Sequence, residues 1–433
     1  MEETVFIATG DSFITRRLPQ PASEAFDQLS ALIRNGDIRF TNLEVITPGP
    51  DAPPSAFSGG TWARADKRVI DDLKKYGFNC MNTATNHVLD YLYEGLYATE
   101  QALKEADIVY AGVGENLHAA SAPKYVEADH SRIALIGATT TFHESWMAGH
   151  QRKDSPGRPG VNGMRVQSTY KVAPERLELL KETADRVGLN HQRNLDIKEG
   201  FLPEDENNRV HFGSYVFEKG NVEASSRTIH KEDISRMVKS IHEAKRQADY
   251  VLVSLHTHEM EGDRKEVPAN FVREAAHRFI DEGADAVIGH GPHILRGIEI
   301  YEGKPIFYSL GNFIFQNDTV QQLPADFYEK YGLSYEHNVA DALDHRSRNG
   351  TIGLGTNPLV WESVVAEWTM SEGQLTQLVL HPIELGFNLP RYRKGWPKLT
   401  NESSPLLRLR DLSEPFGTKM EIVDGKAIVQ IPT

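Results

Sequence analysis

Short apolar runs that end in polar side chains recur along this chain, and they constrain its fold more than any other feature of the sequence. VFIATGD near the N-terminus is the first such run, and YVLVSLH and ADAVIGH are two later ones. Runs of this length suit buried strands. The segments between them place apolar residues at helical spacing, as in ASEAFDQLSALIRN. The alternation predicts a mixed α/β fold in which two packed sheets carry helices on their outer faces.

The same patterns place individual helices and one hairpin. We expect helices within residues 22–35, 68–78 and 95–106, and in the segments KEDISRMVKSIHEAKRQA and NFVREAAHRFIDEG. The stretch IEIYEGKPIFYSLGNFIF is typical of two strands joined at Glu302–Gly303, because this dipeptide suits the tight turn of an antiparallel hairpin.

The whole chain, residues 1–433, is expected to form a single domain with one large insertion at residues 146–230. The insertion holds a Pro/Gly-rich loop, one helix in PERLELLKETADRVG and a polar, irregular tract. We expect it to act as a lid or as an oligomerisation element, which leaves a homodimer open. Residues 317–433 form a variable C-terminal segment in which VVAEWTM and QLTQLVLHPIEL complete the sheets before a coil-rich tail.

Composition and charge exclude some classes of function. The formal net charge of -14 argues against a general nucleic-acid binder. No segment holds about 18 uninterrupted apolar residues, so no membrane span is expected. The N-terminal MEETVFIATGD lacks the positive residues of a signal peptide, and the single cysteine, Cys80, can form no disulfide within the chain. We therefore expect a cytoplasmic protein without nucleic-acid or membrane partners.

Five of the expected strand ends carry side chains that can bind a metal ion. They are Asp11 in ATGDS, Asn42 and Glu44 in FTNLEV, Asn86 and His87 in TATNHVLD, His256 and His258 in SLHTHE, and His290 and His293 in GHGPH. Taken singly, each is better explained as a turn, a helix cap or a hydrogen-bonded imidazole. Taken together they favour one site, because ligands bind at the carboxyl ends of strands in open α/β sheets.

The residue types indicate which ions such a site would hold. A mixture of carboxylate, amide and imidazole favours Mn²⁺, Zn²⁺ or Fe, since Mg²⁺ and Ca²⁺ prefer more oxygen ligands. One or two divalent ions are expected, and Mg²⁺ or Ca²⁺ stays open as an alternative. The pair His290 and His293 fits this interpretation, because glycine in the GHGPH loop allows the backbone to turn both rings toward one point.

The order and spacing of these residues resemble the poly-γ-glutamate capsule biosynthesis protein family, the CapA-like branch of the calcineurin-like metallophosphoesterase superfamily. The shared features are a Gly-Asp after the first strand, then NLE, then NH followed by Asp90, then SLH, and finally the block GHGPHILRGIEIYEGKPIFYSLGNFIF. The resemblance covers residues 4–145 and 248–316. It implies a four-layer α-β-β-α sandwich of the metallophosphoesterase type, with a metal site that is often dinuclear.

The resemblance also implies a role for each motif residue. The implied metal ligands are Asp11, Glu44, Asn86, His256, His290 and His293. His87 would protonate a leaving group or steady a developing negative charge, and Asn42 and Asp90 would orient the ligands. The residues expected to take part in the chemistry are therefore Asp11, His87 and His293.

Two motifs depart from the family pattern. The superfamily usually places a histidine two residues after its first aspartate, but this chain reads Gly10-Asp11-Ser12-Phe13, so a single-metal site stays open. The family tends to show Trp-Gly after SLH, where this chain has Thr257-His258-Glu259. For His258 we favour a hydrogen-bonding role over an extra ligand or a proton-transfer group. Founding members are tied to the membrane or exterior, and this sequence shows no anchor, so we do not expect it to make capsule polymer.

Three classes of function follow from this interpretation. The first is a metal-dependent hydrolase that uses a metal-activated water on a phosphoester or a γ-glutamyl peptide. The second is a metal-dependent peptide epimerase with His87 or His293 as base, and the third is a noncatalytic polymer-binding protein. A small-molecule or peptide substrate is expected in each enzyme class, and Arg158 and Arg64, with Trp146, His150 and Trp62, are the candidates to contact it.

Overall fold

The computed structural model describes residues 3–204 and 209–432, and the chain divides into two compact units. Unit 1 comprises Met1–Met164 and Ser235–Thr433, and unit 2 comprises Arg165–Ile234. All of the strand-end candidates lie in unit 1. Residues 146–164, which we grouped with the insertion, also belong to unit 1, where Trp146 is buried against Val161 and its neighbours.

The larger sheet of unit 1 is built around the first strand of the chain. Its strands in spatial order are β23 (Met420–Val423), β24 (Lys426–Val429), β21 (Gln374–Glu384), β20 (Glu362–Ser371), β1 (Thr4–Phe13), β2 (Ile38–Leu43), β3 (Cys80–Asn82) and β4 (Val109–Ala111). Strands β1 to β4 run parallel, and the sheet continues through β20, antiparallel to β1, and β21, antiparallel to β20. In addition, β19 (Asn312–Phe315) pairs with β1, and β22 (Lys398–Leu399) pairs with β21.

The second sheet contains the apolar runs from the middle of the chain. Its strands in spatial order are β17 (Leu295–Tyr301), β18 (Lys304–Leu310), β16 (Ala286–His290), β13 (Tyr250–His256), β7 (Arg132–Thr139) and β6 (Lys124–Glu127). Strands β7, β13 and β16 run parallel. The predicted hairpin is confirmed as β17 and β18, and its turn residues Glu302 and Gly303 both have positive φ, as in a type I′ turn.

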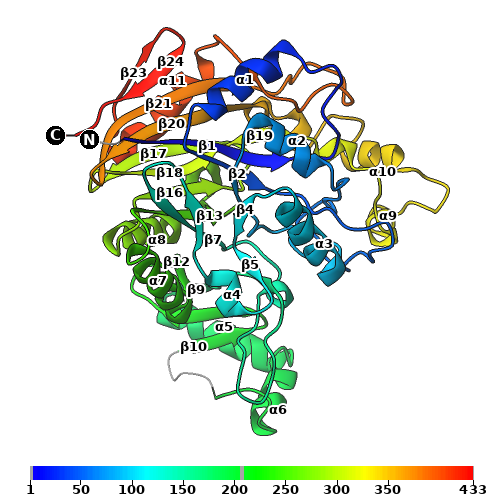
Figure 1. Ribbon diagram of the computed structural model, residues 1–433. Coiled ribbons are helices and arrows are strands. Elements are labelled where there is room, and N and C mark those ends of the chain that lie inside the picture. Colours follow the sequence, from blue (N-terminus) through cyan, green and yellow to red (C-terminus); the bar gives the residue numbers. More distant parts are fainter. Residues whose placement is uncertain (1–2, 205–208, 433) are drawn as a thin grey trace. The chain divides into compact units, whose positions relative to one another are not determined.

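One apolar core joins the two sheets face to face. Phe6 of β1 stacks on Trp368 of β20 with ring centroids 5.1 Å apart, and Phe307 of β18 lies 5.3 Å from the same Trp368 ring. Phe40 of β2 and Leu252 of β13 are buried in the same cluster. In Figure 1 the strands β1, β20 and β21 accordingly lie against β16, β17 and β18. The prediction of an α/β fold is confirmed.

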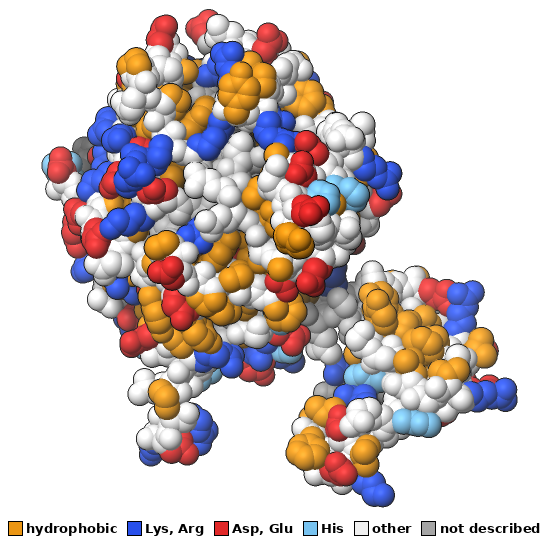
Figure 2. All heavy atoms as spheres, turned by 90° about the vertical axis from the view of Figure 1, so that its right-hand side faces the viewer, with side chains coloured by type: hydrophobic (Ala, Val, Ile, Leu, Met, Phe, Trp, Pro, Cys, Tyr) orange, Lys and Arg blue, Asp and Glu red, His pale blue; other side chains and the backbone are white. Residues whose placement is uncertain are grey.

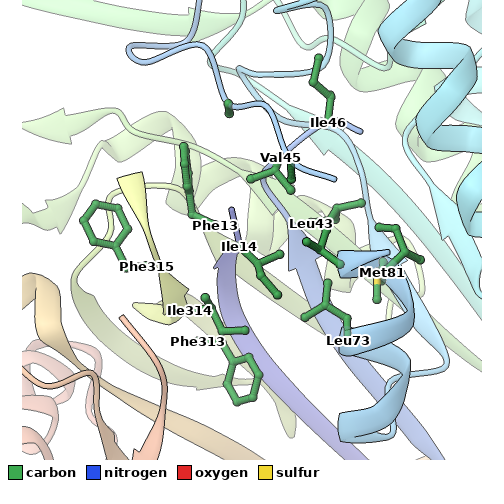
Figure 3. Close-up of a cluster of buried hydrophobic side chains, with 14 of the residues drawn as sticks. Phe13, Ile14, Leu43, Val45, Ile46, Leu73, Met81, Phe313, Ile314 and Phe315 are labelled. Atoms are coloured by element: carbon green, nitrogen blue, oxygen red, sulfur yellow. The ribbon is translucent and has the colours of Figure 1, made fainter. Parts of the chain in front are cut away.

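Helices cover the other face of the larger sheet, as their apolar spacing predicts. They are α1 (Glu24–Arg34), α2 (Val69–Tyr76) and α3 (Leu92–Glu105). Ser23 caps the start of α1 by accepting a hydrogen bond from the Phe26 amide, and Gly77 ends α2 with φ of 115°. Figure 3 shows part of the resulting core, in which Leu73 of α2 lies among Leu43 and Met81 of the sheet.

Helices also follow the strands of the second sheet. These are α7 (Lys231–Lys245) and α8 (Asn270–Asp281), and α8 buries Phe271, Val272 and Phe279 and contacts β16. Unit 1 further contains α4 (Leu117–Ser121) and the short strands β5 (Val113–Gly114), β8 (Gly160–Val161), β14 (Met260–Glu261) and β15 (Arg264–Pro268). No helix in the described part of the chain has the length and apolar character needed to cross a membrane.

The C-terminal segment contains more regular structure than the variable region and coil-rich tail that we expected. Beyond β21 the chain forms α11 (Ser404–Ser413) and the β23–β24 hairpin, and between β19 and β20 it forms α9 (Ala325–Lys330) and α10 (Val339–Arg346). These helices are short, and α11 buries only Leu406, Leu409 and two small residues. So few apolar positions give too weak a periodic signal to identify a helix from sequence.

Unit 2 also contains more regular structure than we expected. The expected helix is confirmed as α5 (Pro174–Arg186), but the chain adds α6 (His191–Lys198) and a four-stranded sheet of β9 (Val166–Val172), β10 (Arg209–Phe212), β11 (Tyr215–Lys219) and β12 (Ala224–Ile229). Part of the tract that we described as irregular lies at residues 205–208, outside the described residues. The four strands contain no buried residue, so they lack the alternating apolar pattern that marks a strand.

A buried ion pair ties α2 to the loop after β1 and makes stability depend on pH. The fully buried Asp72 carboxylate accepts hydrogen bonds from Arg17 Nη2 (3.0 Å), Lys75 Nζ (3.0 Å) and the Leu18 amide (3.1 Å). Burial alone would raise the pKa of Asp72, but these donors outweigh it and the net pKa is lowered. The pair therefore stabilises the fold above pH ~4, the usual pKa of an unfolded aspartate, and is lost as pH falls through the lower folded pKa.

We predict that Asp72→Asn lowers the free energy of unfolding at pH 7 by roughly 1–3 kcal/mol, because charge-assisted hydrogen bonds are lost. The difference from wild type should shrink below pH ~4, where Asp72 of the unfolded chain becomes protonated, and should vanish below the lower pKa of the folded protein. Urea denaturation at several pH values measures both effects. Asp71→Asn is the control, because Asp71 is exposed on the same helix. Equal losses in the two variants, or a difference independent of pH, would contradict the assignment.

Candidate metal centre

The strand register brings the candidate residues to one edge of each sheet. In the larger sheet Asp11 of β1 is level with Asn42 of β2, and Asn42 is level with Asn82 of β3. In the second sheet His256 of β13 is level with His290 of β16. Since all of these strands are parallel within their sheets, their carboxyl ends point the same way. The two sheets pack face to face, so both rows of side chains reach the same place.

The candidates converge on a compact cluster of ligand atoms. Three sets have ligand atoms within 4.8 Å of one another: Asp11, His256 and His290; Glu44, His256 and His258; and Asp11, Glu44 and His293. Asp11 Oδ1 lies 3.9 Å from His290 Nδ1, and Asp11 Oδ2 lies 3.7 Å from His293 Nδ1. Asp11, Glu44, His256 and His290 are 0% exposed.

The His256 ring separates two groups of ligand atoms. Its Nδ1 lies 3.0 Å from His290 Nδ1 and 4.0 Å from Asp11 Oδ1. Its Nε2 lies 2.8 Å from Asn86 Oδ1, 3.0 Å from His258 Nε2 and 3.7 Å from Glu44 Oε1. The geometry is therefore compatible with one cation or with two.

The residues present fit a divalent cation. Both carboxylate oxygens of Glu44 are buried and have no hydrogen-bond donor among the described residues, although a buried carboxylate without a partner is costly. Metal–nitrogen bonds of about 2.0–2.1 Å place neighbouring ligand atoms roughly 3 Å apart, which matches the contacts made by His256. Carboxylate and imidazole donors together suit Mn²⁺, Zn²⁺ or Fe.

Burial controls the charge state of these groups. It raises the pKa of Asp11 to about 7 and the pKa of Glu44 well above its usual value. It lowers the pKa of His290 and of His293 to about 3, and the pKa of His256 well below its usual value. The imidazoles are therefore neutral at pH 7, which is the state that binds a metal. A bound cation would favour the charged form of both carboxylates.

Amide and hydroxyl side chains hold the ligand atoms in place. Asn42 donates from Nδ2 to Asp11 Oδ1 (2.7 Å) and accepts at Oδ1 from Asn82 Nδ2 (2.7 Å). Ser254 Oγ lies 2.6 Å from His290 Nε2, and Asn312 Oδ1 lies 2.9 Å from His293 Nδ1. The sequence analysis named only Asn42 among these four. Asn82 ends a strand and Asn312 lies in the conspicuous SLGN block, so both positions carried a usable signal.

The GHGPH loop explains how two histidines reach the cluster from one strand end. Gly291 has φ of 115°, and its amide donates to Asp11 Oδ2 at 3.0 Å. A side chain at Gly291 would be strained at this φ. His293 itself has φ of 59°, a left-handed conformation that is uncommon for residues other than glycine. This turn directs His293 toward Asp11 and Glu44, while His290 stays in the sheet.

His87 lies at the edge of the cluster and forms a pair with Asp90. His87 Nδ1 lies 2.7 Å from Asp90 Oδ2, and Asp90 also accepts from the amides of Ala63 (2.7 Å) and Gly59 (3.2 Å). The neighbouring Asn86 points its Oδ1 at His256 and donates to the Gly59 carbonyl at 3.0 Å. Of the two residues in the NH motif, Asn86 thus contacts His256 inside the cluster, and His87 lies at its edge beside Asp90.

A pocket of about 530 Å³ gives access to the cluster from outside, and His87 and His293 are among its lining residues. The residues that we expected to contact substrate do not line it. Arg158 is exposed and donates to the Met147 carbonyl, and Arg64 donates to the Gly49 carbonyl. The others likewise lie elsewhere: Trp146 and Trp62 are core residues, and His150 is exposed. The sequence shows the type of each of these side chains but not which way it points, so it could not show that they lie away from the pocket.

A family model described as bacterial capsule synthesis protein PGA_cap matches residues 5–317. The uncharacterized protein y4sH of Sinorhizobium fredii is 33% identical over 441 aligned residues, which cover 98% of this chain and 92% of that protein. The capsule biosynthesis protein CapA of Bacillus anthracis is 26% identical over 72% of this chain and 60% of its own length. A hypothetical protein from Thermus thermophilus aligns with 88% of this chain and 99% of its own, at 12% identity and a TM-score of 0.38.

We predict that His290→Ala and Asp11→Asn each weaken metal binding by tenfold or more, since even loss of a residue that supports a ligand typically costs 10–100-fold. Metal content after dialysis, measured by mass spectrometry, tests this prediction. His118→Ala is the control because His118 is exposed outside the cluster. Wild-type metal content in both site variants would show that the site lies elsewhere.

Close backbone packing at Gly10 should be needed to position Asp11. A Cβ at Gly10 would lie 1.9 Å from the Gly311 carbonyl oxygen, which also accepts a hydrogen bond from the Asp11 amide at 2.9 Å. We predict that Gly10→Ala lowers both metal content and the free energy of unfolding, the latter by roughly 1–3 kcal/mol. Gly49→Ala is the matched control, because no atom lies within 4 Å of its Cβ position. If the two variants behave alike, the backbone contact does not position the site.

Proposed function

The chain belongs to the family of bacterial capsule synthesis proteins, PGA_cap, and from that premise we propose that it is a metal-dependent hydrolase. The observation that carries the proposal is the buried cluster of Asp11, Glu44 and histidines, in which Glu44 lacks any donor among the described residues and which meets a pocket at His87 and His293. A structural zinc site would more typically be closed by four ligands. A site next to a pocket suits catalysis better.

The contacts within the cluster determine the role that we propose for each residue. Asp11, Glu44, His256, His290 and His293 would hold the cation, with Asn86 and His258 at its edge. A cation held there would supply Lewis acidity, because it lowers the pKa of a bound water toward about 7 and polarises the oxygen of an electrophile. The proposed fold is the four-layer sandwich of the metallophosphoesterase type, with the site at the carboxyl edges of both sheets.

We assign His87 the role of general acid. Its Nδ1 contacts Asp90, which fixes the ring and leaves Nε2 as the nitrogen for proton transfer. Its T-shaped contact with Phe13, at 5.4 Å between ring centroids, holds the ring from another side. Phe13 occupies the position where the superfamily usually has a metal-binding histidine, so in this chain the position supports the acid instead.

The proposed substrate is a phosphoester or a γ-glutamyl peptide. The hydrolase fold favours the first, and the name of the Bacillus anthracis relative, which refers to capsule biosynthesis, favours a role near polymer metabolism. The cytoplasmic location expected from the sequence remains a prediction. A peptide epimerase would use the same ions and imidazoles, and it is distinguished by the exchange of an α-proton.

We predict that the metal-loaded protein hydrolyses p-nitrophenyl phosphate or γ-glutamyl peptides, and that His87→Gln lowers the turnover number by about 10²–10⁴-fold without lowering metal content. Asp90→Asn should cause part of the same loss, whereas His143→Gln, which changes an exposed imidazole, should not. Absorbance and product analysis measure turnover.

The same samples distinguish the rival functions. A metal-loaded protein that hydrolyses neither class of substrate but takes up α-deuterium from D₂O into a peptide would be an epimerase. A metal-loaded protein inert in both assays would be a binding protein, and the hydrolase proposal would be rejected.

A further inference from the structure

The pocket beside the metal centre is strongly cationic on the side formed by residues after 317. Its lining includes Lys330, Arg346, Arg391 and Lys394, and Asp318 is the single carboxylate among its described lining residues. The protein as a whole has a net charge of -14. A local excess of positive charge in an acidic protein attracts anions to that place. Figure 2 faces the side of the molecule on which α9 and α10 lie, and there Lys and Arg side chains gather among acidic and apolar ones.

Arg346, at the end of α10, is held close to the metal centre. Its Nη1 donates to Thr61 Oγ1, its Nη2 lies 3.5 Å from Asp318 Oδ1, and its guanidinium lies over the Phe327 ring at 5.6 Å. The nearby Gly59 donates its amide to Asp90 and accepts at its carbonyl from Asn86. Thr61, which contacts Arg346, therefore lies two residues after Gly59, which contacts Asn86 and Asp90.

Lys394 reaches the same place from a different segment. Its Nζ lies 4.2 Å from the centre of the Trp361 ring and 4.0 Å from Asp318 Oδ2, and its side chain is only 14% exposed. Arg346 and Lys394 thus share the single negative charge of Asp318. One of their two positive charges is therefore not balanced by this carboxylate. Arg391 differs from them because it pairs with Asp344. Burial lowers the pKa of both Arg346 and Lys394, as expected for cations with too little water and too little opposing charge.

We propose that Arg346 and Lys394 form a subsite that binds an anionic group of the substrate, a phosphate or a carboxylate, beside the metal centre. Arg346 supplies the planar fork that binds such groups through paired hydrogen bonds, and Lys394 supplies a point charge. The inference rests on the proposed function in that the bound group belongs to the substrate of the metal centre. Both residues lie outside residues 5–317, which the family model matches, so the subsite would determine which anion this chain accepts.

Anion binding to the metal-loaded, full-length protein tests the subsite without requiring turnover. We predict that inorganic phosphate or glutarate binds, as measured by calorimetry, and that Arg346→Gln and Lys394→Gln each weaken binding by about tenfold or more. Asp318→Asn should strengthen binding, because it removes the competing carboxylate. Arg393→Gln is the matched control, since Arg393 is exposed next to Lys394 and outside the pocket lining. Metal content and thermal unfolding of each variant exclude indirect losses.

The outcomes separate this inference from the hydrolase proposal. Preferential binding of phosphate supports a phosphorylated substrate group, and preferential binding of glutarate supports a carboxylated one. If wild-type protein binds neither anion, or if both lysine and arginine variants bind them like wild type, the subsite is disproved even when the protein hydrolyses a substrate. Binding that depends on Arg346 and Lys394 supports the subsite even when no hydrolysis is found, in which case the hydrolase proposal alone fails.

Discussion

The burial of two carboxylates at one point is the constraint on which the rest of the structure depends. Asp11 and Glu44 are fully buried, and Glu44 has no donor among the described residues. An unpaired buried charge costs far more than one hydrogen bond returns, so such groups are normally paired, neutralised or bound to a metal. The imidazoles cannot serve as counter-ions, because burial keeps His290 and His293 neutral at pH 7. A cation satisfies the carboxylates and the imidazoles together.

The apolar sandwich makes this convergence rigid. Phe6, Trp368 and Phe307 fix the two sheets face to face, and parallel pairing fixes the level of each strand end. Ligand positions then follow from backbone register rather than from flexible loops, which suits a site that must hold its geometry without help from the ion. Residues beyond the strand ends are exceptions: Asn86 lies four residues after β3, and in the GHGPH turn the positive φ of Gly291 and His293 bends the chain back into the cluster.

Sequence reasoning reached the α/β fold and the convergence of the motif residues because both depend on local patterns. Apolar periodicity identifies strands, and polar residues at the ends of parallel strands necessarily meet at one edge. It missed Asn82 and Asn312 although both stand in noticeable positions of the sequence, because their hydrogen-bond partners become visible only in the structure. It failed for the strands of unit 2, because these strands contain no buried residue. It also placed Arg64 and Arg158 near the substrate, because the charge of a side chain does not show which way that side chain points.

The segment that carries Arg346 is anchored so that the proposed anion subsite is separate from the proposed metal ligands. It leaves β19, which pairs with the end of β1, and it returns as β20, which pairs with the start of β1 on the same side, opposite β2. Both ends are therefore fixed beside the strand that carries Asp11, while the helices α9 and α10 between them are short and largely exposed. Changes in this segment would alter the pocket without moving the ligands, since loops on a rigid scaffold vary more freely than the strands that hold them. On our proposal, this segment would determine which anion is bound, while the strands beside it hold the ligands of the cation.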